Sequence, residues 1–150
     1  MFGLNMIVHK GRTIFVGDTS VHEYPSSEQM AEIAISTARV VRLFGFDPKV
    51  AFVSHSTFGQ PLTSRTKHIR SAVEILKEKK VDFEFDGDMQ PDVALNPEYE
   101  ELYPFAKIVG KANILIMPGQ HSAAISYKLM KTIGDTKVIG PLLILSLIHI

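Results

Sequence analysis

The stretch Lys49-Val50-Ala51-Phe52-Val53-Ser54-His55-Ser56-Thr57-Phe58-Gly59-Gln60-Pro61 joins a short apolar run to a polar loop. The run Val50–Val53 is typical of a strand that is buried on both faces, as in parallel sheets. The loop after it offers hydroxyls and backbone N–H groups, and Gly59 and Pro61 end it. We expect any ligand site of this chain to be centred here.

A helix is predicted after this loop, and its charges are unusual. Cations at its end, from Lys77 onward, complement the helix dipole, whereas cations at its beginning oppose the dipole and cost roughly a few tenths of a kcal/mol each. Two interpretations remain open: a tolerated surface cluster, or an anion such as phosphate bound at the helix start. The cationic residues at the beginning are Arg65, Lys67, His68 and Arg70.

The remaining pattern predicts an α/β sandwich with a largely parallel sheet, because strands and helices alternate along the chain. A hairpin is predicted to turn at Lys10–Arg12. A capping box of Ser26 with Gln29 begins a predicted helix, which Gly45 ends. The other predicted elements are a buried strand at Ile114–Met117, a helix carrying Ile125, Leu129 and Ile133 at four-residue spacing, and a strand at Val138–Leu143. Gln120-His121-Ser122 then lies at a strand-to-helix turn, where parallel α/β sheets bind ligands.

Two connecting segments have simpler interpretations. Val81–Phe85 alternates apolar and acidic residues, which predicts a half-exposed strand leading into a turn of solvated carboxylates at Asp86–Asp92. A calcium loop does not fit there, because Pro91 stands where Gly is needed and Pro97 where Glu is needed. In the segment Asn96–Lys107 we expect the large apolar residues to cover the core; they are Tyr99, Leu102, Tyr103 and Phe105.

Composition narrows the class of protein. The 150 residues correspond to one domain, and 16 basic and 16 acidic residues cancel, so no overall charge favours nucleic acid or an anionic membrane. The chain has no Cys, which excludes disulfides, thiolate metal sites and Cys nucleophiles. Residues 1–8 lack the features of a signal peptide, and we expect a cytoplasmic protein without a membrane span.

Common catalytic motifs are absent. Ser beside His occurs twice, at Ser54-His55-Ser56 and His121-Ser122, but no G-x-S-x-G elbow is present, and sequence neighbours do not normally form the nucleophile–base hydrogen bond. Neither the P-loop nor the G-x-G-x-x-G pattern occurs. What remains is two loops rich in donors at one sheet edge, suited to a phosphate-bearing or carbonyl-bearing ligand.

Five ordered motifs over about residues 2–144 resemble the phosphotransacetylase (phosphate acetyl/butyryltransferase) family. They are Phe2–Asp18 with Ser27–Ala34, Pro48–Gly59, Asp86–Leu95, Ala112–Pro118 with Ser126-Tyr127-Lys128, and Ile139-Gly140-Pro141-Leu142. Three details are similar to the version fused to the C-terminus of NADP-dependent malic enzymes: Phe58, where free-standing transacetylases usually carry Lys, and the segments Ala94–Pro97 and Gly119–Ala123.

The resemblance implies a three-layer α/β/α sandwich with a mostly parallel sheet, similar to isocitrate and isopropylmalate dehydrogenases and incomplete at both ends. It divides the chain into a partial domain at 1–144 and a tail at 145–150 that matches nothing in the family and is interpreted as truncated or foreign sequence. The family's Ser-Arg-Gly catalytic segment is missing. No catalytic residue and no metal site are therefore assigned, and we expect neither transacetylase nor malic activity from this chain alone.

The implied function is part of a regulatory domain that binds acetyl-CoA as an allosteric effector. The parent protein would convert malate to pyruvate and CO₂ with NADP and Mg or Mn in an upstream malic-enzyme domain, and would form a homo-oligomer. Candidates to bind the CoA phosphates are Arg65, Lys67 and Arg70. Candidates to line the thioester and pantetheine end are Ser54, Ser56, Thr57 and Gly59. Further candidate ligand contacts are Asp88, Gln120, His121 and Ser122. Two alternatives remain: an active phosphate acetyl/butyryltransferase, and an oligomerisation unit with Tyr99–Phe105 as interface.

Overall fold

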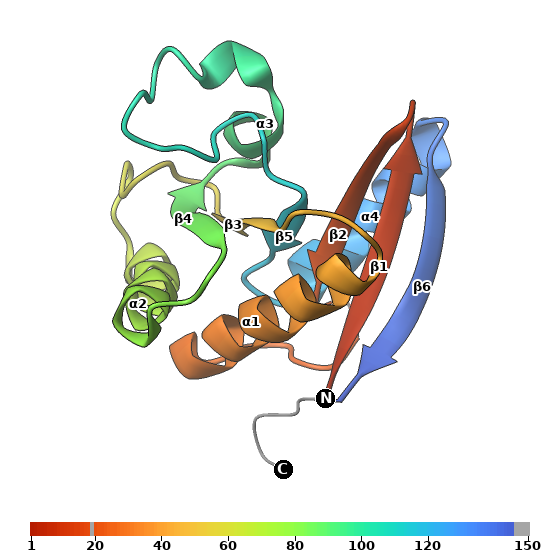
Figure 1. The fold of residues 1–150 in the computed structure, drawn as a ribbon, viewed down its shortest axis with the longest axis horizontal. Helices are drawn as coiled ribbons and strands as arrows, with labels where there is room; N and C mark the ends of the chain where they lie inside the picture. Colours follow the sequence, from red (N-terminus) through yellow and green to blue (C-terminus); the bar gives the residue numbers. More distant parts are fainter. Residues whose placement is uncertain (19, 146–150) are drawn as a thin grey trace.

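The computed structural model describes residues 1–18 and 20–145, which form a six-stranded sheet with helices on both faces (Figure 1). In chain order the elements are β1 (Phe2–His9), β2 (Arg12–Gly17), α1 (Ser27–Leu43), β3 (Lys49–Val53), α2 (Ser64–Lys79), β4 (Glu84–Met89), α3 (Pro91–Leu95), a 3₁₀ helix (Pro97–Tyr99), β5 (Ile114–Ile116), α4 (Gln120–Ile133) and β6 (Lys137–Ile144).

The sheet has the strand order β4-β3-β5-β2-β1-β6 and consists of a parallel and an antiparallel part. β2, β5, β3 and β4 are parallel, whereas β1 pairs antiparallel with both β2 and β6. Lys10 and Gly11 join β1 to β2 with φ angles of 47° and 78°, as a two-residue turn with positive φ at both positions requires. The predicted hairpin and the mostly parallel α/β sheet are confirmed.

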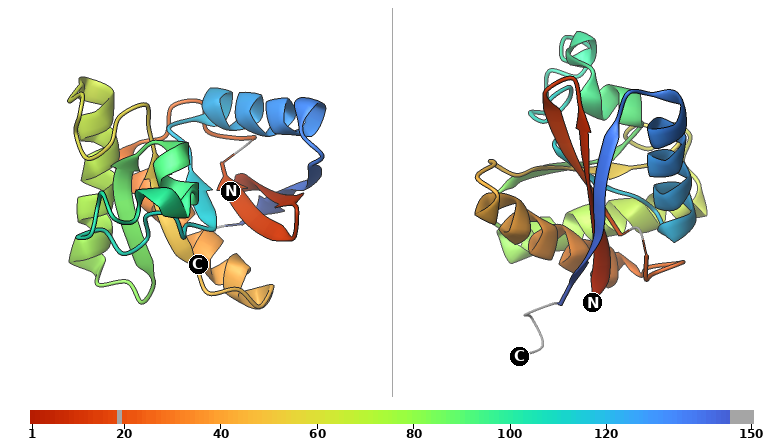
Figure 2. Two further views of the ribbon diagram at one scale, coloured as in Figure 1. Left: turned by 90° about the horizontal axis from the view of Figure 1, so that it is seen from above. Right: turned by 90° about the vertical axis from the view of Figure 1, so that its right-hand side faces the viewer.

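Helices cover the two faces of the sheet, so the fold has three layers. α1 and α2 pack on one face around Phe15, Phe52 and Leu76, all at most 1% exposed. α3, α4 and the segment 96–112 pack on the other face, around Val16, Met89 and Ile108. The right-hand view of Figure 2 shows α1 and α4 on opposite sides of the antiparallel strands.

α1 begins and ends where the sequence predicts. The Ser26 hydroxyl accepts a hydrogen bond from the Gln29 N–H at 3.0 Å, and the Gln29 amide oxygen accepts one from the Ser26 N–H at 2.8 Å. This capping box satisfies N–H groups that the helix itself cannot pair. At the other end the chain leaves the helix through Gly45, with a φ of 89°.

The prediction for the segment 81–92 is wrong in two respects. The strand β4 begins only at Glu84 and continues through Asp86 and Asp88, which the sequence had suggested were part of a solvated turn. Asp88 is fully buried, at 0% exposure. Its donors come from the loop after β3, so the local sequence alone does not reveal that a carboxylate here is satisfied inside the protein.

The segment 96–107 covers the core with fewer of its aromatic residues than expected. Tyr99 and Tyr103 pack against the second core as predicted, together with the buried Ala106. Leu102 and Phe105, however, are 67% and 70% exposed.

Two further expectations concern the ends of the chain and membranes. The tail predicted at 145–150 lies outside the described residues from position 146 onward. Within residues 1–18 and 20–145, none of the helices combines the length and the hydrophobicity needed to cross a membrane.

Candidate functional site

Three helices begin at the edge of the sheet where the parallel strands end. β2 leads to α1, β3 leads to α2 and β5 leads to α4, and the two paired neighbours β3 and β5 end side by side. α2, which follows β3, covers one face, whereas α4, which follows the neighbouring strand β5, covers the other, so two adjacent strands lead to opposite faces. Such a change creates the crevice in which open α/β sheets bind ligands. The predicted meeting of the two polar loops at one edge is confirmed.

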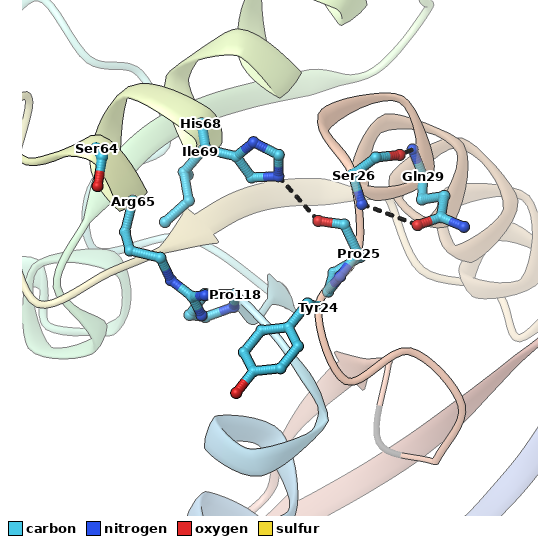
Figure 3. Close-up of a pocket in the computed structure, with 9 residues that line it drawn as sticks. All are labelled: Tyr24, Pro25, Ser26, Gln29, Ser64, Arg65, His68, Ile69 and Pro118. Carbon is cyan, nitrogen blue, oxygen red and sulfur yellow. Dashed lines mark hydrogen bonds between the residues drawn. The ribbon is translucent and has the colours of Figure 1, made fainter.

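A cavity of about 520 Å³ occupies this edge, between the beginnings of α1 and α2 and the turn after β5 (Figure 3). Its volume falls within the range of small-molecule sites, about 300–1,000 Å³. The lining residues are Tyr24, Pro25, Ser26, Gln29, Ser64, Arg65, His68, Ile69 and Pro118.

One buried carboxylate organises the loop that forms a wall of this cavity. Asp18 is 3% exposed and accepts backbone hydrogen bonds from Gly3, Ser20, Val21 and His22, at 2.7 to 3.1 Å. The His22 Nδ1 lies 2.7 Å from the same carboxylate. Burial on its own would raise the pKa of Asp18, but the hydrogen bonds outweigh burial and hold this pKa below its ordinary value. Asp18 therefore stays ionised and fixes the chain that leads to Tyr24.

His68 connects the beginning of α2 to the beginning of α1. Its Nε2 lies 2.9 Å from the Pro25 carbonyl oxygen, so Nε2 carries the proton, because a carbonyl only accepts. In return, the Ser27 hydroxyl donates to the His68 carbonyl at 2.9 Å. These bonds, drawn in part in Figure 3, hold both helix starts in a defined position beside the cavity.

Arg65 supplies the positive charge of the cavity. Its guanidinium carbon lies 5.3 Å from the centre of the Tyr24 ring, and Figure 3 shows the two side chains close together. Both residues are exposed, which places them at the mouth of the cavity. Such a cation–π contact orients an arginine without neutralising it. Among the described residues no carboxylate pairs with Arg65 within 4.0 Å, so its charge is available.

The hydroxyls of the loop after β3 point inward. The Ser56 hydroxyl donates to the Asp88 carboxylate, and the Gly59 N–H donates to the same carboxylate at 3.1 Å. The Ser54 hydroxyl accepts from the Ser56 N–H at 3.1 Å. Ser54, Ser56 and Asp88 are 6%, 0% and 0% exposed. Ser54, Ser56, Gly59 and Asp88 therefore attach the loop after β3 to β4. We call these four residues the internal brace.

The start of α4 is covered by the loop that Asp18 organises. The Gln120 N–H donates to the His22 carbonyl at 3.0 Å, and the His121 ring pairs with Glu23 at 3.1 Å. A side chain at Gly119 would have no room, because its Cβ would clash with the Glu23 carbonyl oxygen. Gln120 and His121 therefore fix the position of His22 and Glu23, in the loop that leads to the cavity residue Tyr24.

Comparison with known proteins gives the family. The model of the family described as "Phosphate acetyl/butaryl transferase" matches residues 1–145. The chain belongs to this family.

The proteins to which this chain is similar include NADP-dependent malic enzymes and phosphate acetyltransferases. The chain is 46% identical over 144 residues to an NADP-dependent malic enzyme of Rhizobium meliloti, a match that covers 96% of this chain and 19% of the relative. It is 42% identical over 138 residues to a phosphate acetyltransferase of Treponema pallidum, covering 89% and 41%. A solved phosphotransacetylase from Streptococcus pyogenes superposes with a TM-score of 0.89 and 30% identity, covering 94% of this chain and 44% of that one. The chain thus spans about a fifth of the malic enzymes that it matches.

In this member of the phosphate acetyl/butaryl transferase family, Phe58 has a structural role. Its φ of 49° is unusual for an aromatic residue, and its N–H donates to the Asp88 carbonyl at 2.7 Å. Its ring lies 5.6 Å from Tyr103 and 5.2 Å from Phe105, centre to centre. Phe58 therefore joins the loop after β3 to the segment 96–107.

The structure divides the predicted site residues into three groups. Ser54, Ser56, Gly59 and Asp88 form the internal brace, and the Thr57 hydroxyl accepts from the Gln90 N–H at 3.3 Å. Gln120, His121 and Ser122 begin α4, where the Ser122 carbonyl accepts from Ser126. Arg65 faces the cavity, whereas Lys67 and Arg70 line a separate hollow of about 810 Å³. Their roles in binding remain predictions.

The sequence pattern did not indicate four residues of this site, which are Asp18, Tyr24, Pro25 and Pro118. An Asp followed two residues later by Ser is a signal for an Asx turn and could have drawn attention to Asp18. The contribution of Tyr24, Pro25 and Pro118 depends on how the loop after β2 meets the loop after β5, and it has no local signal. Within the described ranges, no three His, Asp or Glu side chains are grouped as metal ligands would be.

Asp86, beside this brace, should make stability depend on pH with a definite sign. Burial raises the pKa of Asp86 above its ordinary value of 3.8, and Lys77, Arg70 and the Gly87 N–H only partly offset this. A raised folded-state pKa means that ionised Asp86 destabilises the fold at pH 7, and the penalty disappears as the pH falls through the raised pKa toward 3.8. Asp86→Asn should therefore raise the free energy of unfolding at pH 7 by about 0.5 kcal/mol, and by nothing at pH 3.

Urea unfolding of the two chains at pH 3 and pH 7 measures this difference. Asp82→Asn is a matched control with the opposite sign, because the hydrogen bond from Arg42 lowers the pKa of Asp82. A loss of stability at pH 7 in Asp86→Asn would contradict the assignment.

Proposed function

We propose that the chain is part of the regulatory phosphotransacetylase-like domain at the C-terminus of an NADP-dependent malic enzyme and that it binds acetyl-CoA. The observation that carries the proposal is the cavity at the carboxyl edge of the sheet, with the unpaired Arg65 at its mouth. Similarity to NADP-dependent malic enzymes over 96% of the chain supports the choice of parent protein.

The cavity favours an anionic ligand. It lies beside the N-terminal ends of α1 and α2, where the helix dipole attracts negative charge. α2 has no acidic residue in its first turn, although its Thr63 and Thr66 side chains form a capping box. A phosphate near Arg65 would supply the missing negative charge. CoA thioesters carry phosphates at one end and an extended, mostly neutral arm at the other, which matches a charged mouth and a largely apolar cavity.

Of the three cations considered for the phosphates, Arg65 is the best placed. Lys67 and Arg70 face a hollow that is also lined by three carboxylates, Glu28, Glu74 and Glu78. These carboxylates would repel a phosphate, whereas the cavity at Arg65 contains no acidic side chain. We therefore assign the phosphate contact to Arg65 and no phosphate contact to Lys67 or Arg70.

Arg65→Ala should weaken acetyl-CoA binding by about 10- to 100-fold, because a charge-assisted hydrogen bond contributes about 1.5–3 kcal/mol. Isothermal titration of the purified chain with acetyl-CoA measures the dissociation constant. Lys67→Ala and Lys107→Ala, which remove the same charge from exposed positions outside the cavity, are matched controls and should change the constant by less than about threefold. Equal effects of Arg65→Ala and Lys67→Ala would contradict the assignment.

An active phosphate acyltransferase is the second candidate, because the chain is 42% identical to a phosphate acetyltransferase of Treponema pallidum. Such an enzyme would transfer the acyl group of acetyl-CoA to inorganic phosphate. The regulatory proposal predicts acetyl-CoA binding without phosphate-dependent release of free CoA, which a thiol reagent detects. Release of CoA that requires phosphate would favour the second candidate.

Several features of the parent protein belong to the same proposal. NADP and Mg or Mn would be bound by the upstream malic-enzyme domain and not by this chain. The parent would be a cytoplasmic homo-oligomer whose malate decarboxylation responds to acetyl-CoA. Assaying that reaction in the full-length protein with and without Arg65→Ala tests whether the cavity is the effector site.

A further inference from the structure

Tyr24 places an aromatic ring at the mouth of the cavity, and most of that ring is open. Tyr24 lines the cavity and is nevertheless 71% exposed. Within residues 1–18 and 20–145, no second aromatic ring packs against it. A single exposed hydrophobic side chain is ordinary on a protein surface, so the position of this one beside the cavity and Arg65 is what gives it meaning.

The two faces of the Tyr24 ring have different surroundings. The guanidinium carbon of Arg65 lies over one face, 5.3 Å from the ring centre. Because the side chain is still largely exposed, the opposite face is open. In Figure 3 the hydroxyl of Tyr24 points away from the other labelled residues, so the phenol does not close the cavity. An open aromatic face beside an unpaired guanidinium suits a ligand that carries both a planar group and a negative charge.

The backbone is fixed on both sides of Tyr24. Before it, the His22 carbonyl accepts a hydrogen bond from the Gln120 N–H at 3.0 Å. After it, the Pro25 carbonyl accepts one from the His68 Nε2 at 2.9 Å. The ring is therefore held at the mouth before a ligand arrives, and a contact that is already ordered loses less entropy on binding.

The planar group that fits this position is a nucleobase. Every base has a flat face that stacks on aromatic side chains, and a nucleotide carries its phosphates close to the base. Acetyl-CoA has its adenine at the end that carries the phosphates, whereas its neutral arm ends in the thioester. With the arm in the largely apolar cavity and the phosphates at Arg65, the adenine lies outside the mouth, where the ring of Tyr24 is open.

We propose that Tyr24 determines the specificity of this site for the nucleotide end of its ligand, because the open face of its ring stacks on the adenine base. Arg65, on the other face of the ring, contacts the phosphates. The inference rests on the proposed binding of acetyl-CoA. It adds that the site selects an adenine nucleotide and does not recognise the acyl arm or a phosphate alone.

Two ligands that differ at the nucleotide end test the inference. Acetyl-CoA carries adenine, whereas acetyl-phosphopantetheine has the same thioester, arm and first phosphate but no base. Tyr24→Leu keeps an apolar side chain without an aromatic face. It should weaken acetyl-CoA binding by about 5- to 100-fold and the binding of acetyl-phosphopantetheine by less than about threefold, because only acetyl-CoA has a base to stack. Isothermal titration of the purified chain with each ligand measures both dissociation constants.

Two further variants and a spectroscopic signal isolate the stacking contact. Tyr24→Phe keeps the ring and should retain the discrimination between the two ligands. Phe44→Leu removes an exposed ring at the other end of α1 and should change neither dissociation constant. In proton NMR, the adenine ring protons should shift upfield on binding to the unmodified chain and to Tyr24→Phe, and not on binding to Tyr24→Leu. Circular dichroism should show that every variant is folded, since Tyr24 is largely exposed.

The possible failures can be told apart. An equal loss for both ligands in Tyr24→Leu would mean that Tyr24 acts only by orienting Arg65. That result would overturn the inference and leave acetyl-CoA binding in place, and so would adenine protons that do not shift. An unmodified chain that binds no acetyl-CoA would overturn the proposed function and this inference with it.

Discussion

Replacing Asp18 with alanine is expected to lower the free energy of unfolding by about 3–4 kcal/mol, a large part of the 5–15 kcal/mol typical of a domain. The side chain accepts four backbone N–H groups and the His22 ring, and its removal leaves donors such as the Gly3 N–H without a partner inside the protein. Each unpaired buried donor costs about 1–3 kcal/mol, and the exposed part of the loop recovers some of this from water.

Urea unfolding followed by circular dichroism measures the effect. Asp18→Asn is the matched control: it keeps one acceptor oxygen and the shape of the side chain, so it should lose about half as much as Asp18→Ala. A loss below about 1 kcal/mol for Asp18→Ala would show that the loop does not depend on this carboxylate.

The pH dependence of Asp18 has the opposite sign to that of Asp86. The folded-state pKa of Asp18 lies below its ordinary value of 3.8, so the stabilisation is complete above pH 3.8 and is lost as the pH falls through the folded-state pKa. The Asp18→Ala defect should therefore be largest at neutral pH and shrink in acid, and a defect that grew in acid would contradict the hydrogen-bonding role.

Asp88→Ala is expected to destabilise the chain by about 3 kcal/mol, because a buried carboxylate that accepts two hydrogen bonds is removed from a site that nothing else fills. The Ser56 hydroxyl and the Gly59 N–H lose their acceptor, and the loop after β3 loses its attachment to β4. Hydrogen exchange at the Gly59 N–H should accelerate together with this loss of stability.

Ser56→Ala separates the two halves of the interaction. It removes the donor but leaves the Gly59 N–H on Asp88, so it should cost about 1–2 kcal/mol and leave exchange at Gly59 slow. If Asp88→Ala were no worse than Ser56→Ala, the carboxylate would not be the centre of the brace.

Local sequence signals predicted the elements that depend on neighbouring residues. The capping box of Ser26 with Gln29 and the Gly45 stop determine α1, and the turn at Lys10 and Gly11 determines the hairpin. Both rest on contacts within three or four positions, so the sequence contains all the partners. The order of the five motifs likewise led to the family, because a set of motifs in order is far more specific than any one of them.

The composition of the site depends on partners that are distant in sequence. Asp88 meets a donor 32 residues away at Ser56, which converts an apparent surface turn into a buried brace. Arg65 and Lys67 are only two positions apart, but a helix turns by about 100° per residue, so they face different hollows. A list of cations at a helix start cannot show which of them faces the ligand.

The sequence alone determined the α/β layout, the starts of the helices, the family and the presence of a polar, cationic edge after Lys49–Pro61. Only the tertiary structure decided that the hydroxyls of that stretch turn inward to Asp88 and that Arg65 with Tyr24 faces the open cavity. The physical reason is the same in each case. Local propensity sets which element forms, whereas burial and hydrogen-bond partners are set by which elements the sheet brings together.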